Sequence, residues 1–294
     1  MSGSLLGGGG GGLGLKMPEI DFFGAKSKGE KICFVVHFGP ATTTQKGEST
    51  PYTRMTAYTI RKRLEELVSG LPSQAKFNVT AFWAGHCNPF AERMLQATSA
   101  HKDLLRQWMA PVNPVESSTE TYGSSFGKFG GLLAKTPWPQ KIDKNIPSFG
   151  PAWYYNYVSP RSDEVKYFGE PVPKDATIHW ARGVFWALVT QRPDTIYVLT
   201  TNYLPSEEGH PQQFTDAYKK ICEDIYDVQG LKRPTVNVVV LTNAGANSRG
   251  ALKTLERFGP LIKASKGKGS VIEDISDFMN KEERRRLESF APKE

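Results

Sequence analysis

Several polar side chains that could bind a ligand stand next to apolar segments of the chain. Imidazole, hydroxyl and carboxamide groups can each donate and accept hydrogen bonds, so a group of them can hold an acidic or neutral ligand. These residues follow the apolar runs 32–36 and 195–200 or open the apolar segment 178–190: His37, Thr177, His179, Thr201 and Asn202. They form a site only if the fold brings these three places together.

Apolar segments of two kinds predict the elements that must position these residues. Short uninterrupted apolar runs, rich in β-branched and aromatic residues, are typical of strands buried on both faces. We expect such strands at 32–36, 77–83, 195–200, 236–241 and 270–275. Segments with helical spacing alternate with them, at 53–67, 95–108, 178–190, 214–226 and 251–258. This alternation predicts a doubly wound α/β fold, with a mostly parallel sheet and helices on both faces.

The carboxyl ends of the predicted strands are the expected place of the site. Doubly wound sheets bind ligands outside these ends, where the strand order reverses. The helix start at 178 adds free N–H groups, which favour an anion or a carboxylate. We therefore expect a ligand-binding crevice there. Two other interpretations stay open: the residues only fill a closed site, or His37 and His179, with His86 or Cys87, bind Zn²⁺.

Three segments carry a family resemblance. They are FFGAKSKGEKICFVVHFG, KFNVTAFW and ARGVFWALVTQRPDTIYVLTTN. Together they resemble the von Willebrand factor A domain family, in particular bacterial members that follow a glycine-rich linker. The resemblance implies a Rossmann-like fold and a role in binding partners. It also implies a Mg²⁺ or Mn²⁺ at the carboxyl edge, held by a DxSxS motif, a Thr and a second Asp.

The chain departs from that family's metal motif at nearly every position. His37 stands where the first Asp belongs, Gly39 and Ala41 stand at the two serines, and Thr201 stands at the later Asp. Only Thr177 fits the family pattern. Because a hard divalent cation prefers carboxylate and other oxygen ligands, we expect no metal bound in the usual way and no cofactor. Gly39 stays part of the expected crevice.

The segment 112–175 loses all periodicity and is predicted to be an inserted loop. Proline, glycine and serine crowd together with aromatic residues there. Exposed Tyr and Trp side chains suit a polypeptide or glycan partner, because they bring a large contact area at a low entropy cost. The expected contact residues are Trp138, Trp153, Tyr154, Tyr155 and Tyr157. The alternative is that these rings cover the domain's own core.

The chain begins with a glycine-rich segment. Residues 1–21 include six consecutive glycines and are expected to form a flexible linker, with the von Willebrand factor A-like domain at 22–294. The segment lacks the charged and apolar regions of a signal peptide. A linker suggests an upstream anchor, so a cell-envelope or periplasmic location is an expectation.

Composition limits the remaining classes of function. The 294 residues are 39% hydrophobic, carry a formal charge of +7 and include three cysteines without a CxxC pair. No apolar run reaches the roughly 18 residues of a membrane span, and a disulfide framework is not indicated. The basic runs lack a nucleic-acid-binding motif, so nucleic acid is an unlikely partner. We expect a protein-interaction or scaffold module with a protein or glycan partner; the alternative is a hydrolase, acting on peptides or glycans, in the crevice or under the insertion.

Overall fold

The computed structural model describes residues 18–38, 42, 50–83, 86–110, 115, 180–201, 203, 211–242 and 248–291. The strands are β1 (Glu19–Phe22), β2 (Ala25–Lys28), β3 (Lys31–His37), β4 (Lys76–Trp83), β5 (His86–Pro89), β6 (Leu95–Gln96), β7 (Thr195–Thr200), β8 (Thr235–Leu241) and β9 (Gly269–Ile272). The helices are α1 (Pro51–Ser69), α2 (Ser99–Met109), α7 (Trp180–Trp186), α8 (Pro211–Ile221), α9 (Ser248–Ser265) and α10 (Lys281–Phe290). Three shorter helical segments are the π-helical η2 (Ala187–Gln191) and η3 (Cys222–Asp227) and the 3-10 helix η4 (Ile275–Phe278).

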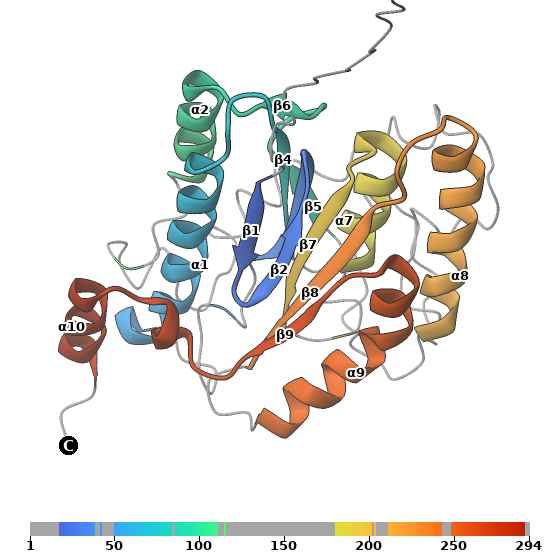
Figure 1. Ribbon diagram of the computed structural model, residues 1–294. Helices are drawn as coiled ribbons and strands as arrows, with labels where there is room; N and C mark the ends of the chain where they lie inside the picture. The colour runs from blue at the N-terminus through green and yellow to red at the C-terminus, as the bar shows by residue number, and fades with distance from the viewer. Residues whose placement is uncertain are drawn as a thin grey trace, which may run out of the picture.

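A seven-stranded sheet forms the centre of the molecule (Figure 1). Its order is β5-β4-β3-β7-β8-β9, and β6 also pairs with β4. The neighbours from β4 to β9 run parallel, whereas β5 and β6 run antiparallel to β4. The predicted α/β fold with a mostly parallel sheet is therefore confirmed, with a mixed edge that the sequence did not indicate.

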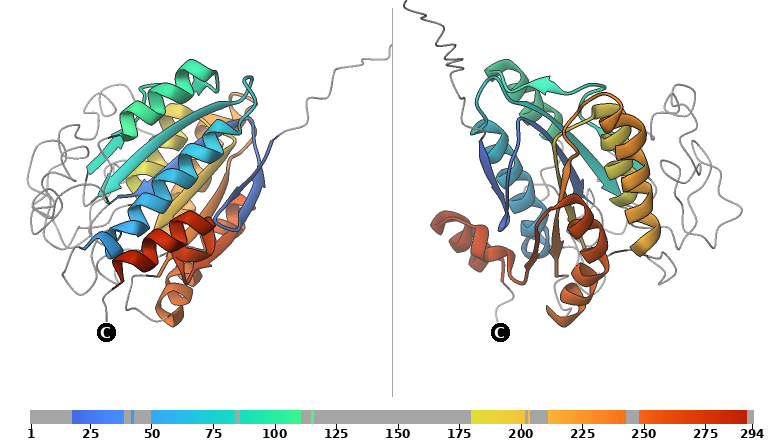
Figure 2. Two further views of the ribbon diagram at one scale, coloured as in Figure 1. Left: turned by 90° about the vertical axis from the view of Figure 1, so that its left-hand side faces the viewer. Right: turned by 45° about the vertical axis from the view of Figure 1, so that its right-hand side comes forward.

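Helices cover both faces of this sheet (Figure 2). One face packs against α1, α2 and the β1–β2 hairpin, with buried residues such as Phe34, Ile60 and Leu105. The other face packs against α7, α8 and α9, with residues such as Val35, Phe185 and Phe258. Burial on both sides explains why the central strands are apolar along their whole length. Among the described helices, none has the length and apolar character required to cross a membrane.

The central strands lie where the sequence predicts them, whereas several other bounds differ. The helix expected at 251–258 spans Ser248–Ser265. The helix expected at 95–108 begins only at Ser99, because Leu95 and Gln96 pair with β4 and Thr98 caps the helix. The strand expected to reach 275 ends at Ile272. β1 begins at Glu19, within the segment 1–21 that was expected to be a linker, and it forms a hairpin with β2. Of the expected insertion 112–175, the structure describes residue 115 alone.

Tyr197 is one of the side chains of the sheet that hold the unexpected hairpin. The Tyr197 hydroxyl donates to the carbonyl oxygens of Ile20 at 3.1 Å and Ser27 at 3.3 Å. Its ring also contacts the ring of Phe22, with 5.6 Å between centroids. The hairpin therefore depends on a side chain of a central strand.

Changing Tyr197 to phenylalanine is expected to lower the free energy of unfolding by about 1–2 kcal/mol, because two buried carbonyls lose their hydrogen-bond donor. The ring contacts should stay. Denaturant unfolding of the variant measures the loss, and amide exchange in 19–28 should accelerate. Unchanged stability and unchanged exchange would contradict this role of the hydroxyl.

Candidate functional site

The strand order reverses at β3. The chain first adds β4 on one side of β3 and later adds β7 on the other. The carboxyl ends of β3 and β7 therefore lie side by side, where doubly wound sheets bind ligands. His37 is the last residue of β3, and Thr201 directly follows β7.

The structure brings these two predicted residues together. His37 Nδ1 lies 3.3 Å from Thr201 Oγ1, and both residues are buried. The imidazole stacks on the ring of Phe82, with 5.1 Å between centroids and 20° between planes. His37 Nε2 is also buried and has no hydrogen-bond partner among the residues that the structure describes. A buried unpaired donor or acceptor costs about 1–3 kcal/mol, which a polar group reaching Nε2 would recover.

Burial determines the charge of this histidine. Loss of hydration disfavours the imidazolium and lowers the pKa of His37 from 6.5 to about 3. No carboxylate contributes to this shift. At neutral pH the strand end therefore carries a neutral hydrogen-bonding ring.

The same shift predicts a pH dependence of stability. The unfolded chain binds a proton at His37 near pH 6.5, whereas the folded chain does so only near pH 3. Stability is then fully present above pH 6.5 and is lost as the pH falls toward 3, by up to about 1.4 kcal/mol per pH unit. The measurement is denaturant unfolding between pH 7 and 4, compared with His37→Asn, which lacks the titrating ring. A constant difference between the two proteins over this range would contradict a buried neutral His37.

The other predicted site residues lie outside the described residues. This holds for Gly39, Thr177, His179 and Asn202 in the crevice. It also holds for the aromatic residues of the insertion: Trp138, Trp153, Tyr154, Tyr155 and Tyr157. For the zinc alternative, β5 places the backbone of Cys87 opposite Phe82 and that of His86 opposite Trp83. Their side chains lie outside the description, so the crevice and the zinc site remain predictions.

The described donors do not fit the cation that the family resemblance implies. Mg²⁺ prefers several oxygen ligands, carboxylates among them. At the ends of β3 and β7 the described groups are an imidazole and a hydroxyl that contact each other. Over the described part of the chain, no cluster of three His, Cys, Asp or Glu residues could hold a metal. We therefore assign no step to a cation here.

The sequence did not indicate a cluster of aromatic rings close to Thr201 in the chain. Trp180 begins α7, and its Nε1 donates to the carbonyl oxygen of Tyr203 at 2.5 Å. Its ring packs against Phe214 and Phe258 at 4.9 Å and 4.6 Å between centroids. This cluster ties the chain after Thr201 to the helical layer. The helical apolar pattern predicts Trp180 as core but gives no sign of its partner two residues beyond Thr201.

Comparison with known proteins assigns the chain neither a family nor a function. The chain matches no protein-family model, and a search of curated proteins finds no match. The functional argument therefore rests on the geometry of the chain itself.

Proposed function

We propose that this chain is a von Willebrand factor A-like interaction domain that binds its partner without a resident divalent cation. The strand order supports the family part of the proposal. Counted from β3 and without β6, the order is 3-2-1-4-5-6, with only β5 antiparallel. This is a doubly wound order, and its reversal lies between the first and fourth strands.

The observation that carries the proposal is the contact between His37 and Thr201. These residues stand where the family resemblance places two aspartates. Their neutral groups lie 3.3 Å apart and satisfy each other instead of presenting negative charge to a cation.

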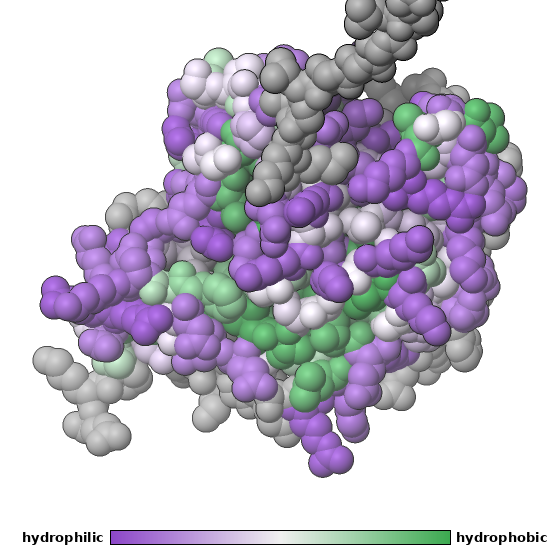
Figure 3. Space-filling view, in the orientation of Figure 1, coloured by the Kyte–Doolittle hydropathy of each residue, from purple (hydrophilic) through white to green (hydrophobic). Residues whose placement is uncertain are grey.

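A surface feature favours a polypeptide partner. Apolar side chains gather in a band over β9 and the neighbouring part of α9, surrounded by hydrophilic residues (Figure 3). On these two elements Leu255, Ile262 and Val271 are only partly buried, and Leu252 is 49% exposed. β9 is also the last strand of the sheet on this side. Contiguous exposed apolar surface with a polar rim is typical of protein contacts.

The test compares capture of partners with and without divalent cation. The immobilised full chain is exposed to lysate of cells that produce it and to a glycan array, in EDTA and in Mg²⁺. We expect the same saturable partner under both conditions, and at least tenfold weaker binding by Leu252→Glu. Val228→Glu is the matched control, because Val228 is also an exposed apolar residue, at 78%, but lies just after η3. Binding that requires Mg²⁺, or catalytic turnover of the captured molecule, contradicts the proposal.

The described residues do not favour the hydrolase alternative. Thr201 and His37 have the residue types of a nucleophile and its base. However, a pKa of about 3 makes His37 a weak base at neutral pH. Burial also raises the pKa of the Cys33 thiol well above its usual range and that of Cys222 to about 11, so both thiols are protonated.

A further inference from the structure

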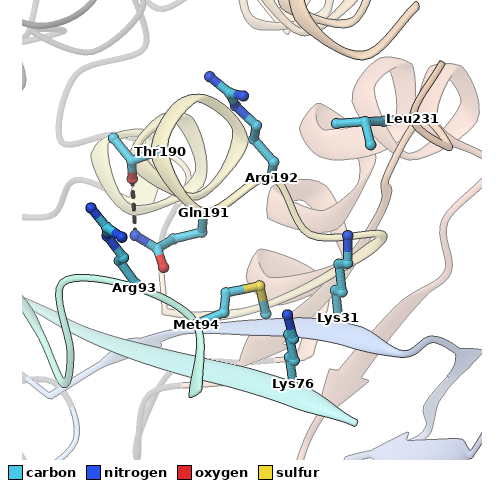
Figure 4. A pocket seen from close by; sticks show the side chains of 8 residues that line it. All are labelled: Lys31, Lys76, Arg93, Met94, Thr190, Gln191, Arg192 and Leu231. Carbon is cyan, nitrogen blue, oxygen red and sulfur yellow. Dashed lines mark hydrogen bonds between the residues drawn. The ribbon is translucent and has the colours of Figure 1, made fainter. Parts of the chain in front are cut away.

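A basic pocket lies at the amino edge of the sheet, opposite the crevice. Its volume is about 380 Å³, which falls within the range of small-molecule sites. Lys31 begins β3 and Lys76 begins β4, while the rest comes from the turn before β6, the end of η2 and the chain after η3. The lining residues are Lys31, Lys76, Arg93, Met94, Thr190, Gln191, Arg192 and Leu231 (Figure 4).

The charges of this pocket are unbalanced. Four lining residues are cationic and none is acidic. Lys31 and Lys76 are direct partners in the parallel register of β3 and β4, and Figure 4 shows both ammonium groups extending from the strands toward the same space. Like charges directly opposite each other destabilise a sheet. Among the described ion pairs, none includes Lys31, Lys76 or Arg93.

The carboxylate of Asp194, which contacts the backbone of Lys31, does not relieve this repulsion. Asp194 Oδ2 accepts hydrogen bonds from the backbone N–H groups of Glu30 at 2.9 Å and Lys31 at 3.1 Å. It fixes the start of β3 instead of pairing with a lysine side chain. Two adjacent cations held in this way could be stabilised by a shared anion from outside the chain.

A buried polar network holds the pocket wall in place. Asn78 Nδ2 donates to Gln191 Oε1 at 3.0 Å and to the carbonyl oxygen of Ala91 at 2.8 Å. Gln191 Nε2 donates in turn to the carbonyl oxygen of Glu92 at 2.8 Å. These bonds join β4, the end of η2 and the turn that carries Arg93, so they fix the backbone from which the cationic side chains extend.

The backbone beside this network is unusual. η2 is a π-helix, and Arg192, which ends it, is left-handed with φ 50° and ψ 55°. π-helical turns occur frequently at functional sites. A left-handed residue other than glycine is uncommon and costs energy, which makes it a pointer to function. The strained residue lies in the wall of the pocket.

We propose that this pocket binds a compact polyanion that carries at least two phosphate groups. One phosphate would lie between Lys31 and Lys76, and the second would approach the Arg93 guanidinium. Met94 and Leu231 supply apolar wall for a non-phosphate part of the ligand. The small volume, bordered by exposed lysine and arginine side chains, favours a small molecule over a nucleic acid, which would need a longer basic stripe.

Calorimetric titration with inorganic pyrophosphate tests the proposal on the full chain. We expect saturable binding that weakens at least tenfold in the double variant Lys31→Gln/Lys76→Gln. The control is Lys219→Gln/Lys253→Gln, which removes the same charge from exposed positions on α8 and α9 and should bind as the parent does. In the absence of pyrophosphate, Lys76→Gln alone should raise the melting temperature, since it removes the opposed charge.

Further titrations identify the source of the phosphates. A nucleoside diphosphate that binds more tightly than pyrophosphate supports a nucleotide ligand, and equal affinity supports recognition of the phosphates alone. The proposal is overturned by no saturable pyrophosphate binding up to about 1 mM, or by equal loss in both double variants. Tighter binding of single-stranded RNA with the same dependence on Lys31 and Lys76 also overturns it.

Discussion

Changing His37 to aspartate is expected to lower the free energy of unfolding by about 3–4 kcal/mol at pH 7. Position 37 is fully buried, and His37 contacts the Thr201 hydroxyl. A carboxylate there must either stay charged without a cationic partner or take up a proton, which costs about 4 kcal/mol at pH 7 for an ordinary aspartate. Adding Mg²⁺ should not restore the loss, because one carboxylate beside a hydroxyl is a poor set of ligands. Denaturant unfolding with and without Mg²⁺ measures both effects.

The matched control for this variant is His37→Asn, because asparagine has nearly the same shape as aspartate but no charge. It should lose about 1–2 kcal/mol through the missing ring contact and hydrogen bond. The gap between the two variants should close as the pH falls, because burial raises the pKa of the new carboxyl group and the folded state then holds it protonated. If Mg²⁺ restored the free energy of unfolding of the His37→Asp variant, the carboxyl edge of the sheet would still form a cation site.

Changing Trp180 to alanine is expected to cost about 3–5 kcal/mol, the range for a fully buried large aromatic residue. Trp180 is completely buried and contacts the rings of Tyr203, Phe214 and Phe258. The variant also removes the donor to the Tyr203 carbonyl oxygen. We expect the amides near Thr201 to exchange faster, since this bond ties the chain after β7 to α7. Thermal unfolding and amide exchange measure the two effects.

Trp180→Phe separates packing from the hydrogen bond. It keeps an aromatic ring in the cluster but has no donor for Tyr203, so it should cost about 1–3 kcal/mol and still accelerate exchange near Thr201. A loss below about 1 kcal/mol for Trp180→Ala would contradict the anchoring role, because cavities of this size cost more.

Periodicity predicted the central sheet well because its strands are buried on both faces. The run at 195–200 coincides with β7, and all six of its residues are buried. Parallel strands with buried carboxyl ends then bring residues 37 and 201 together, although 164 positions separate them. The contact followed from strand order, which the alternation of strands and helices strongly restricts.

Short polar strands could not be predicted in the same way. β2 consists of Ala25–Lys28 and has no apolar alternation. Its place is explained by tertiary contacts, such as the hydrogen bonds from the hydroxyls of Tyr197 and Thr195. The basic pocket was missed for a related reason. Lys31 and Lys76 are single charges at strand starts, and only the register of β3 and β4 places them side by side.

The central claim is that this α/β domain carries a neutral histidine–threonine contact at the position where the proposed von Willebrand factor A family holds a cation. Paramagnetic broadening by Mn²⁺ in the amide NMR spectrum tests this claim most directly. We predict that the signals of His37 and Thr201 keep their intensity relative to the rest of the spectrum as Mn²⁺ is added. Saturable loss of these two signals, abolished by Thr201→Ala, would contradict the claim.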